Sequence, residues 1–90
     1  MINLEYTKTF IKDFKKLKNT IWYQELFDFC FNDIDSIPDW FNTNDIKKIK
    51  GYDNYYRIRK GVYRIGIKLE NNTITLVRIL HRNDVYKFFP

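Results

Sequence analysis

The apolar residues at the start of the chain change from alternation to helical spacing. Residues 2–6 alternate apolar and polar side chains, which predicts a short strand. Thr7 or Thr9 is placed to cap a following helix, because a threonine hydroxyl accepts a hydrogen bond from an amide of the first turn. We expect this helix to run to about Lys18. Its apolar residues share one face that would pack on a sheet: Phe10, Ile11, Phe14 and Leu17.

A second helical pattern covers residues 21–37, after a break in which Thr20 is placed to act as another cap. Pro38 ends the pattern because proline cannot continue a helix. Because the break between the two helical patterns is so short, we expect the helices to form an antiparallel hairpin. The core side of the second helix is expected to carry Leu26, Phe29, Cys30, Ile34 and Ile37. Three rings lie outside that stripe and either form an interface or wrap around the first helix: Trp22, Phe27 and Phe31.

In the second half of the chain the apolar period changes to two, which is typical of strands. A short edge strand is expected at residues 46–50, and three longer strands at 55–60, 62–69 and 73–80. Lys60-Gly61 and Asn71-Asn72 supply the turns between them. Residues 81–90 are long enough for one or two turns of helix. The predicted fold is α+β, in the order β-α-α-β-β-β(-α), with an antiparallel sheet packed against the helical hairpin.

Alternation within the strands is expected to collect basic side chains on one face of the sheet. On strand 55–60 two arginines lie opposite Ile58, and on strand 62–69 an arginine and a lysine lie opposite Ile65. If the isoleucines face the helices, Gly66 leaves room on the other face for a backbone to approach. That face would bind a phosphate chain, the alternative being an ordinary solvated face that happens to be basic. Its basic residues are Arg57, Arg59, Arg64 and Lys68.

Composition and charge narrow the class of protein. Ninety residues, 44% of them apolar, allow a single domain over residues 1–90 with a core of its own. The net charge of +5 is uneven: residues 1–45 carry five lysines and eight acids, whereas residues 46–90 carry eleven basic residues and three acids. All five arginines lie in the second half, which favours a polyanionic partner. One cysteine, no leader and no long apolar run predict a cytoplasmic protein that does not enter membranes.

The only histidine directly follows the last predicted strand and opens the sequence HRNDVY. Histidine accepts or donates a proton near neutral pH, so His81 is a candidate for acid-base chemistry, with Tyr86 as a second proton donor. Arg82 between them is placed to steady a phosphate. A lone histidine is more often structural than catalytic, so its position in the sequence leaves both interpretations open.

Taken together, YYRIRKGVYRIGIKL and, about twelve residues later, HRNDVY resemble the motifs of the RelE/ParE toxin superfamily. The family's pattern is a strand ending in basic residues, then Gly-x-Tyr-Arg, then a last strand ending in His-Arg-x-x-x-Tyr. The order of a strand, a helical hairpin and an antiparallel meander extends the likeness over nearly the whole chain. The chain therefore resembles a RelE/HigB-like toxin of a type II toxin-antitoxin system.

The resemblance implies an endoribonuclease that cleaves messenger RNA in association with the ribosome, needs neither metal nor cofactor, and inhibits translation and growth. In the reaction of such relatives a ribose 2′-hydroxyl attacks the adjacent phosphate. Arg64 matches the arginine of the family's Tyr-Arg element and would stabilise the developing charge. His81 and Tyr86 match the end motif as a proton-transfer pair, and we expect them to lie beside Arg64 around a single scissile linkage. The residues expected to bind the substrate are Arg57, Arg59, Arg82, Lys68 and Lys50.

The chain departs from some nuclease relatives, which carry a glutamate base on the strand before the Arg-x-Arg segment. Lys47, Lys48 and Lys50 stand there instead, which leaves His81 as the expected base and Asp53 as a fallback. The resemblance also implies a cognate antitoxin that covers the basic face with an acidic segment and lays a helix on the second helix. Two other functions stay open: a ParE-like toxin that inhibits DNA gyrase, and a non-catalytic RNA-binding module.

Overall fold

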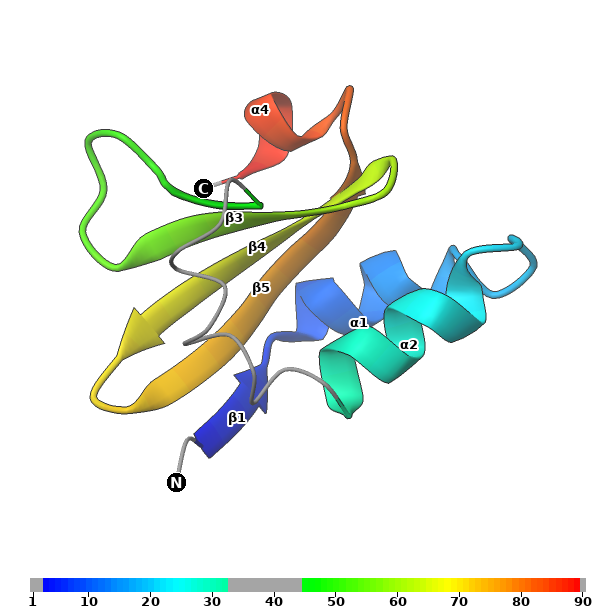
Figure 1. Ribbon diagram of the computed structural model, residues 1–90, viewed down its shortest axis with the longest axis horizontal. Helices are drawn as coiled ribbons and strands as arrows, with labels where there is room; N and C mark the ends of the chain where they lie inside the picture. The colour runs from blue at the N-terminus through cyan, green and yellow to red at the C-terminus, as the bar shows by residue number, and fades with distance from the viewer. Residues whose placement is uncertain (1–2, 33–44, 90) are drawn as a thin grey trace.

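The computed structural model describes residues 3–32 and 45–89, which form a five-stranded sheet with a helical hairpin on one side (Figure 1). A short helix follows the last strand. The α+β class is confirmed, with the predicted order of elements. The elements are β1 (Asn3–Tyr6), α1 (Lys8–Lys15), α2 (Tyr23–Phe31), β2 (Ile46–Lys48), β3 (Tyr55–Lys60), β4 (Tyr63–Glu70), β5 (Thr73–His81) and α4 (Val85–Phe88).

The strands lie in the order β1-β5-β4-β3-β2. β2 to β5 form the predicted antiparallel meander, and β1 joins β5 in parallel. The predicted turns are confirmed by backbone angles that few residue types adopt. Asn71 and Asn72 have φ of 52° and 62°, and Gly61 has φ of 60°. Asparagine and glycine tolerate this left-handed region, which fits both hairpins.

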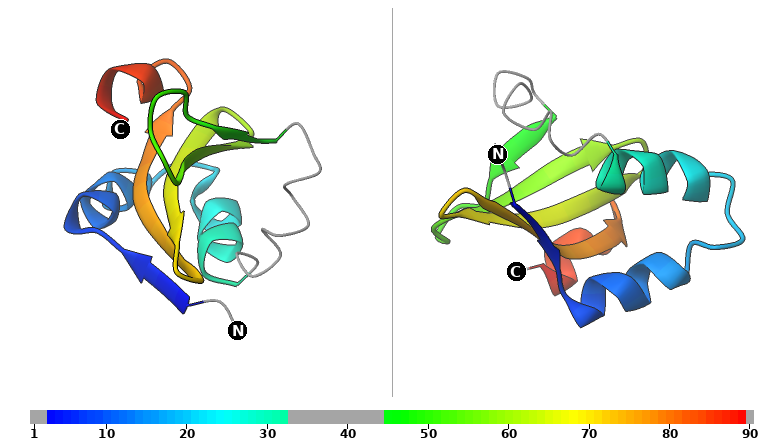
Figure 2. Two further views of the ribbon diagram at one scale, coloured as in Figure 1. Left: turned by 90° about the vertical axis from the view of Figure 1, so that its left-hand side faces the viewer. Right: turned by 90° about the horizontal axis from the view of Figure 1, so that it is seen from below.

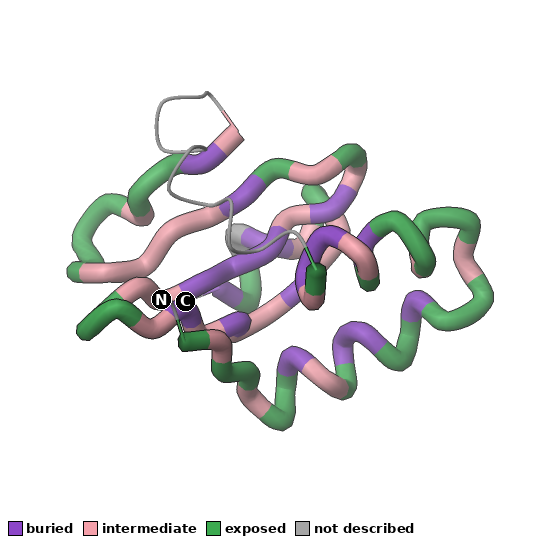
Figure 3. The backbone as a smooth tube through the Cα atoms, turned by 60° about the horizontal axis from the view of Figure 1, so that its bottom comes forward, coloured by how far each residue is buried: buried purple, intermediate pink, exposed green. Residues whose placement is uncertain are grey.

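The two helices form an antiparallel hairpin that covers one face of the sheet (Figure 2). The ring centroids of Phe10 and Phe31 lie 6.4 Å apart, and those of Phe14 and Tyr23 lie 5.2 Å apart, so the start of α1 meets the end of α2. Figure 3 shows buried residues recurring along both helices and running through the central strands. The shared core contains Phe10, Phe14, Leu26, Phe29, Cys30, Ile58, Ile65, Ile67, Ile74 and Leu76.

Of the two threonines placed to cap α1, Thr7 is the N-cap, and its Oγ1 accepts from the backbone N–H of Phe10 at 3.0 Å. Three other predictions about the helices are corrected. α1 ends at Lys15, earlier than expected. Thr20 caps nothing, because its hydroxyl donates to the carbonyl of Leu17 at 2.8 Å and α2 begins only at Tyr23. α2 ends at Phe31, and the predictions for Ile34, Ile37 and Pro38 lie outside the described part of the chain.

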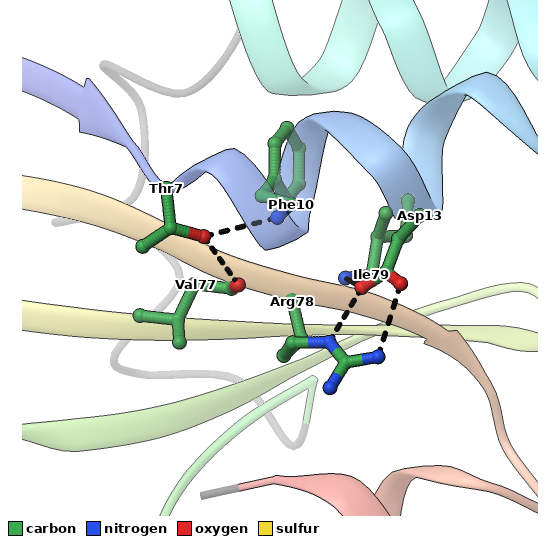
Figure 4. A network of polar contacts seen from close by, with 6 residues as sticks. All are labelled: Thr7, Phe10, Asp13, Val77, Arg78 and Ile79. Atoms are coloured by element: carbon green, nitrogen blue, oxygen red, sulfur yellow. Dashed lines mark hydrogen bonds and ion pairs between the residues drawn. The ribbon is translucent and has the colours of Figure 1, made fainter.

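α1 is attached to the edge of β5 by polar side chains (Figure 4). β1 ends at Tyr6, so among the described residues the second half of β5 pairs with β4 on one side and has no strand on its outer edge. The Thr7 hydroxyl donates to the Val77 carbonyl at 2.8 Å. Asp13, which is only 5% exposed, accepts from the Ile79 amide at 3.2 Å and from Arg78 Nε and Nη2 at 2.6 and 3.0 Å. These bonds satisfy an edge that would otherwise remain open.

Candidate nucleic-acid interface

A cavity of about 300 Å³ lies on the face of the sheet that the hairpin leaves uncovered. It is predominantly basic, and we call it the arginine pocket. Its basic residues come from β2, β3, β4 and the turn that follows β5, so the pocket depends on the whole meander. The residues that line it are Asp45, Lys47, Arg57, Arg59, Arg64, Arg82 and Asn83.

Strand register brings the basic side chains together. Arg59 pairs with Arg64 across β3 and β4, and Lys47 pairs with Arg57 across β2 and β3. Residues paired across antiparallel strands share a face, so these four side chains point to the same side of the sheet. Arg82 joins them from the turn, where its backbone N–H donates to the Val62 carbonyl at 2.9 Å. The prediction that alternation gathers three arginines on one face is confirmed.

The guanidinium of Arg64 is anchored to the backbone. Its Nη1 donates to the carbonyls of Gly61 and Tyr63 at 2.8 and 2.9 Å, which fixes the guanidinium against the β3–β4 turn. Burial lowers the pKa of Arg64, and the positive charges of Arg57, Arg59 and Arg82 lower it further. The same clustering of positive charge makes the pocket attractive to an anion, although Asp45 already neutralises part of that charge.

Asp45 brings the only carboxylate that lines the arginine pocket in the described part of the chain. Its Oδ1 accepts from Nε and Nη2 of Arg59 at 3.1 and 2.9 Å, and its carbonyl accepts from the Arg59 amide at 2.6 Å. The side chain stays 39% exposed. Sequence analysis missed Asp45, although its place directly before β2, whose Lys47 lies beside Arg57, could have suggested it. Asp53, the expected fallback base, lies exposed in the turn before β3 and does not line the pocket.

The expectation that His81 lies beside Arg64 is wrong. The imidazole is half-buried on the helix side of the sheet, where its ring lies 5.9 Å from that of its register partner Tyr63. The cause is a bulge in β5: Leu76 pairs with Ile67 and Arg78 with Gly66, so one extra residue, Val77, shifts the alternation. His81 lines a different cavity, beside α1 and α4.

Two other predicted substrate-binding residues lie outside the arginine pocket. Lys68 is on the expected face, but its Nζ is 3.5 Å from Glu70 and 5.9 Å from the centre of the Tyr55 ring. Lys50 lies beyond the end of β2 and lines a neighbouring cavity. The space over Gly66, expected to admit a ligand backbone, holds the ring of Phe89, whose Cε1 is 2.5 Å from where a Cβ would stand.

The surplus rings of α2 pack mainly within the protein. Trp22 contacts Tyr63 with ring centroids 5.6 Å apart, and Phe27 contacts Phe14 at 6.2 Å. Trp22 and Phe27 nevertheless remain 36% and 39% exposed, so the wrapping is incomplete. The backbone of Tyr86 lies in α4, and its side chain is outside what the structure describes.

Two kinds of feature are absent from residues 3–32 and 45–89. Histidine, cysteine and acidic residues do not gather there in groups of three or more that could hold a metal ion. No described helix is long and apolar enough to cross a membrane.

Known proteins match nearly the whole length of the chain. The family described as the ParE toxin of the type II toxin-antitoxin system parDE matches residues 4–86. Toxin RelE3 of Methanocaldococcus jannaschii is 46% identical over 87 residues, which are 94% of this chain and 96% of the relative. These matches span nearly all of the strands and helices described above.

Solved structures show the same architecture. A chain of the RelB-RelE antitoxin-toxin complex from Methanococcus jannaschii is 41% identical and superposes with a TM-score of 0.68, covering 96% of this chain and 99% of that one. A chain of the archaeal RelE-RelB complex from Pyrococcus horikoshii gives a TM-score of 0.67 at 21% identity, covering 90% and 94% of the two chains. The second likeness shows the fold alone.

Proposed function

The chain belongs to the RelE/ParE family of type II toxin-antitoxin toxins, and we propose that it is an endoribonuclease that cleaves messenger RNA. The observation that carries this proposal is the convergence of Arg57, Arg59, Arg64 and Arg82 in one open cavity. An RNA phosphate complements the net positive charge of this cluster, which the single carboxylate of Asp45 balances only in part. Because phosphates are common to all sequences, the arginine pocket holds the backbone and leaves base selection to its surroundings.

The pocket supplies the charge that phosphodiester cleavage needs. In the proposed reaction the ribose 2′-oxygen forms a bond to the adjacent phosphorus, and the bond from phosphorus to the 5′-oxygen of the next nucleotide breaks. The products are a 2′,3′-cyclic phosphate and a free 5′-hydroxyl. Arg64, fixed by its two backbone carbonyls, stabilises the extra negative charge of the five-coordinate phosphorus. Arg57, Arg59 and Arg82 orient the phosphate.

The reaction also moves two protons. We assign acceptance of the 2′-hydroxyl proton to Asp45, whose carboxylate borders the arginine pocket and is held by Arg59. The 5′-oxygen takes a proton from a donor on the opposite side of the phosphate, for which Tyr86 remains the predicted residue. His81 faces the helix side of the sheet, so we no longer assign it a direct proton transfer. Since side chains supply every charge in this scheme, we expect cleavage to persist in EDTA.

We propose a cognate antitoxin as the protein partner and the translating ribosome as the place of action, which puts the toxin in the cytoplasm. The similar structure at 41% identity is a RelB-RelE antitoxin-toxin complex, and this supports a partner of the same kind. An acidic antitoxin segment laid over the arginine pocket would neutralise its charge and exclude RNA. Binding of RNA and of such a segment would then be mutually exclusive.

The test is a cleavage assay with the purified protein and a defined message, in EDTA, with and without translating ribosomes. We expect new ends that carry a 2′,3′-cyclic phosphate upstream of the cut and a 5′-hydroxyl downstream. Arg64→Ala should abolish these ends while leaving the fold intact by circular dichroism. Intact message together with trapped gyrase-DNA complexes would instead establish a ParE-like toxin. RNA binding without any cut, at any ribosome concentration, would reduce the protein to an RNA-binding module.

A further inference from the structure

The neighbouring cavity that Lys50 lines has a volume of about 340 Å³ and adjoins the arginine pocket on the β2 side. The two cavities share Lys47 and Arg57, so a nucleotide chain bound in one leads directly into the other. We call this cavity the lysine notch. Its lining is formed by Lys47, Lys48, Ile49, Lys50, Arg57 and Phe89.

The lysine notch has an apolar aromatic wall. The Phe89 ring is 6% exposed and rests on Gly66, where the absence of a Cβ allows its close approach. Its centroid lies 5.8 Å from that of Tyr55, and Tyr55 lies 6.1 Å from Tyr52, which continues the row of rings outward. With Ile49, the part of the Phe89 ring that borders the lysine notch forms an apolar wall, and a nucleobase can pack against such a surface while its polar edge faces the lysines.

Three lysines on the rim of the lysine notch have ammonium groups available to a ligand. Lys47, Lys48 and Lys50 have no ion-pair partner among residues 3–32 and 45–89. A lysine ammonium group donates hydrogen bonds and accepts none. A base that turns acceptors toward this rim gains hydrogen bonds, whereas an exocyclic amine turned toward it meets only other donors.

From these features we propose that the lysine notch holds the nucleobase next to the scissile phosphate and selects keto bases, guanine and uracil, over adenine and cytosine. Guanine presents O6 and N7 as acceptors, and uracil presents O4, whereas adenine and cytosine place an amine at the equivalent position. This inference rests on the proposed cleavage of RNA, since it assumes that the arginine pocket holds the phosphate. It adds a selectivity that charge alone does not provide.

The test uses short RNA strands that bind but cannot be cut. Each strand has a 2′-deoxy sugar at the attacking position and one of the four bases on either side of the central phosphate. Fluorescence anisotropy then measures affinity without depending on catalysis. At one of the two positions we expect wild type to bind guanine and uracil about tenfold more tightly than adenine and cytosine. Equal affinity for all four bases at both positions overturns the proposal.

Matched variants locate the selectivity. Lys50→Gln introduces an acceptor and should reduce the keto preference to about twofold or less, whereas Lys87→Gln on α4 should leave it unchanged. Phe89→Leu should weaken binding of all four bases by about tenfold, and Phe88→Leu, its exposed neighbour, should not. Thermal melting checks that each variant is folded. A keto preference that survives in each of Lys47→Gln, Lys48→Gln and Lys50→Gln would show that the lysines of the notch do not select the base.

The two proposals fail separately. If uncuttable strands show the keto preference but natural RNA is never cut, the lysine notch stands and the nuclease assignment falls. If RNA is cut with no preference at either flanking base, the nuclease assignment stands and the lysine notch is not a base-binding site.

Discussion

Removal of the Asp13 carboxylate should destabilise the protein more than any other single charge change in the described residues. The carboxylate is 5% exposed and accepts three hydrogen bonds, two from Arg78 and one from the Ile79 amide. Asparagine in its place has one oxygen and no charge, so at least one Arg78 bond is lost and the guanidinium, with its side chain only 21% exposed, is left without a counter-ion.

The expected cost is about 3 kcal/mol, because an arginine stripped of its buried partner retains the penalty of desolvation. A domain of this size has a total stability of roughly 5–13 kcal/mol, so the loss is a large part of it. The consequence should also appear locally, since Asp13 holds α1 against the open edge of β5.

Urea unfolding followed by circular dichroism measures this effect. With a slope of about 1.5 kcal/mol per molar urea, the midpoint should fall by about 2 M. Asp53→Asn, an exposed carboxylate in a turn, is the matched control and should move the midpoint by less than about 0.3 M. The double variant Asp13→Asn, Arg78→Met should recover much of the loss, because no charge is left unpaired and the amide oxygen can still accept from the Ile79 N–H. A midpoint for Asp13→Asn equal to that of the control would refute the structural role assigned to this pair.

Three further outcomes follow from single contacts. Burial raises the pKa of the Cys30 thiol from 9.0 to about 12, so the thiol of the unfolded chain ionises first as the pH rises. Between those pH values the free energy of unfolding should fall by about 1.4 kcal/mol per pH unit relative to Cys30→Ala. Parallel alkaline unfolding curves for the two proteins would contradict this. Gly66→Ala would place a Cβ 2.5 Å from the Phe89 ring and so displace that ring. Hydrogen exchange should then show that the α4 amides lose protection. Unchanged protection would mean that Phe89 does not rest on Gly66. Inorganic pyrophosphate at ten times its dissociation constant should stabilise wild type by about 1.4 kcal/mol in a thermal melt and Arg64→Ala by much less; equal stabilisation would place the anion elsewhere.

Most of the fold could be predicted from the sequence because its signals are local and agree with one another. Asparagine pairs and glycine mark the turns, and strict alternation marks the strands between them, so the meander admits one register with its isoleucines inward. Helix ends were harder to predict. Thr20 stands where a cap would be useful, but its hydroxyl bonds backward to Leu17, a choice that depends on how the chain turns.

The candidate site was predictable only where alternation is unbroken. Arg57, Arg59 and Arg64 lie within one regular hairpin, so their common face followed from counting. His81 lies beyond the bulge at Val77, and a single extra residue moves every later side chain of β5 to the opposite face. No local signal marks that bulge. Asp45 and Phe89 were missed for a related reason, since each reaches its place through a contact distant in sequence, Asp45 with Arg59 and Phe89 with Gly66.

The central claim is that cleavage takes place in the arginine pocket, on the face of the sheet opposite His81. Single-turnover cleavage rates of Arg64→Ala and His81→Gln, each compared with wild type on the same message, test it most directly. We predict that Arg64→Ala falls by about 100- to 1000-fold, as expected for the loss of a group that stabilises the transition state, while His81→Gln stays within about threefold of wild type. A cleavage rate for Arg64→Ala equal to that of wild type would contradict this claim. So would the loss of cleavage in a folded His81→Gln protein.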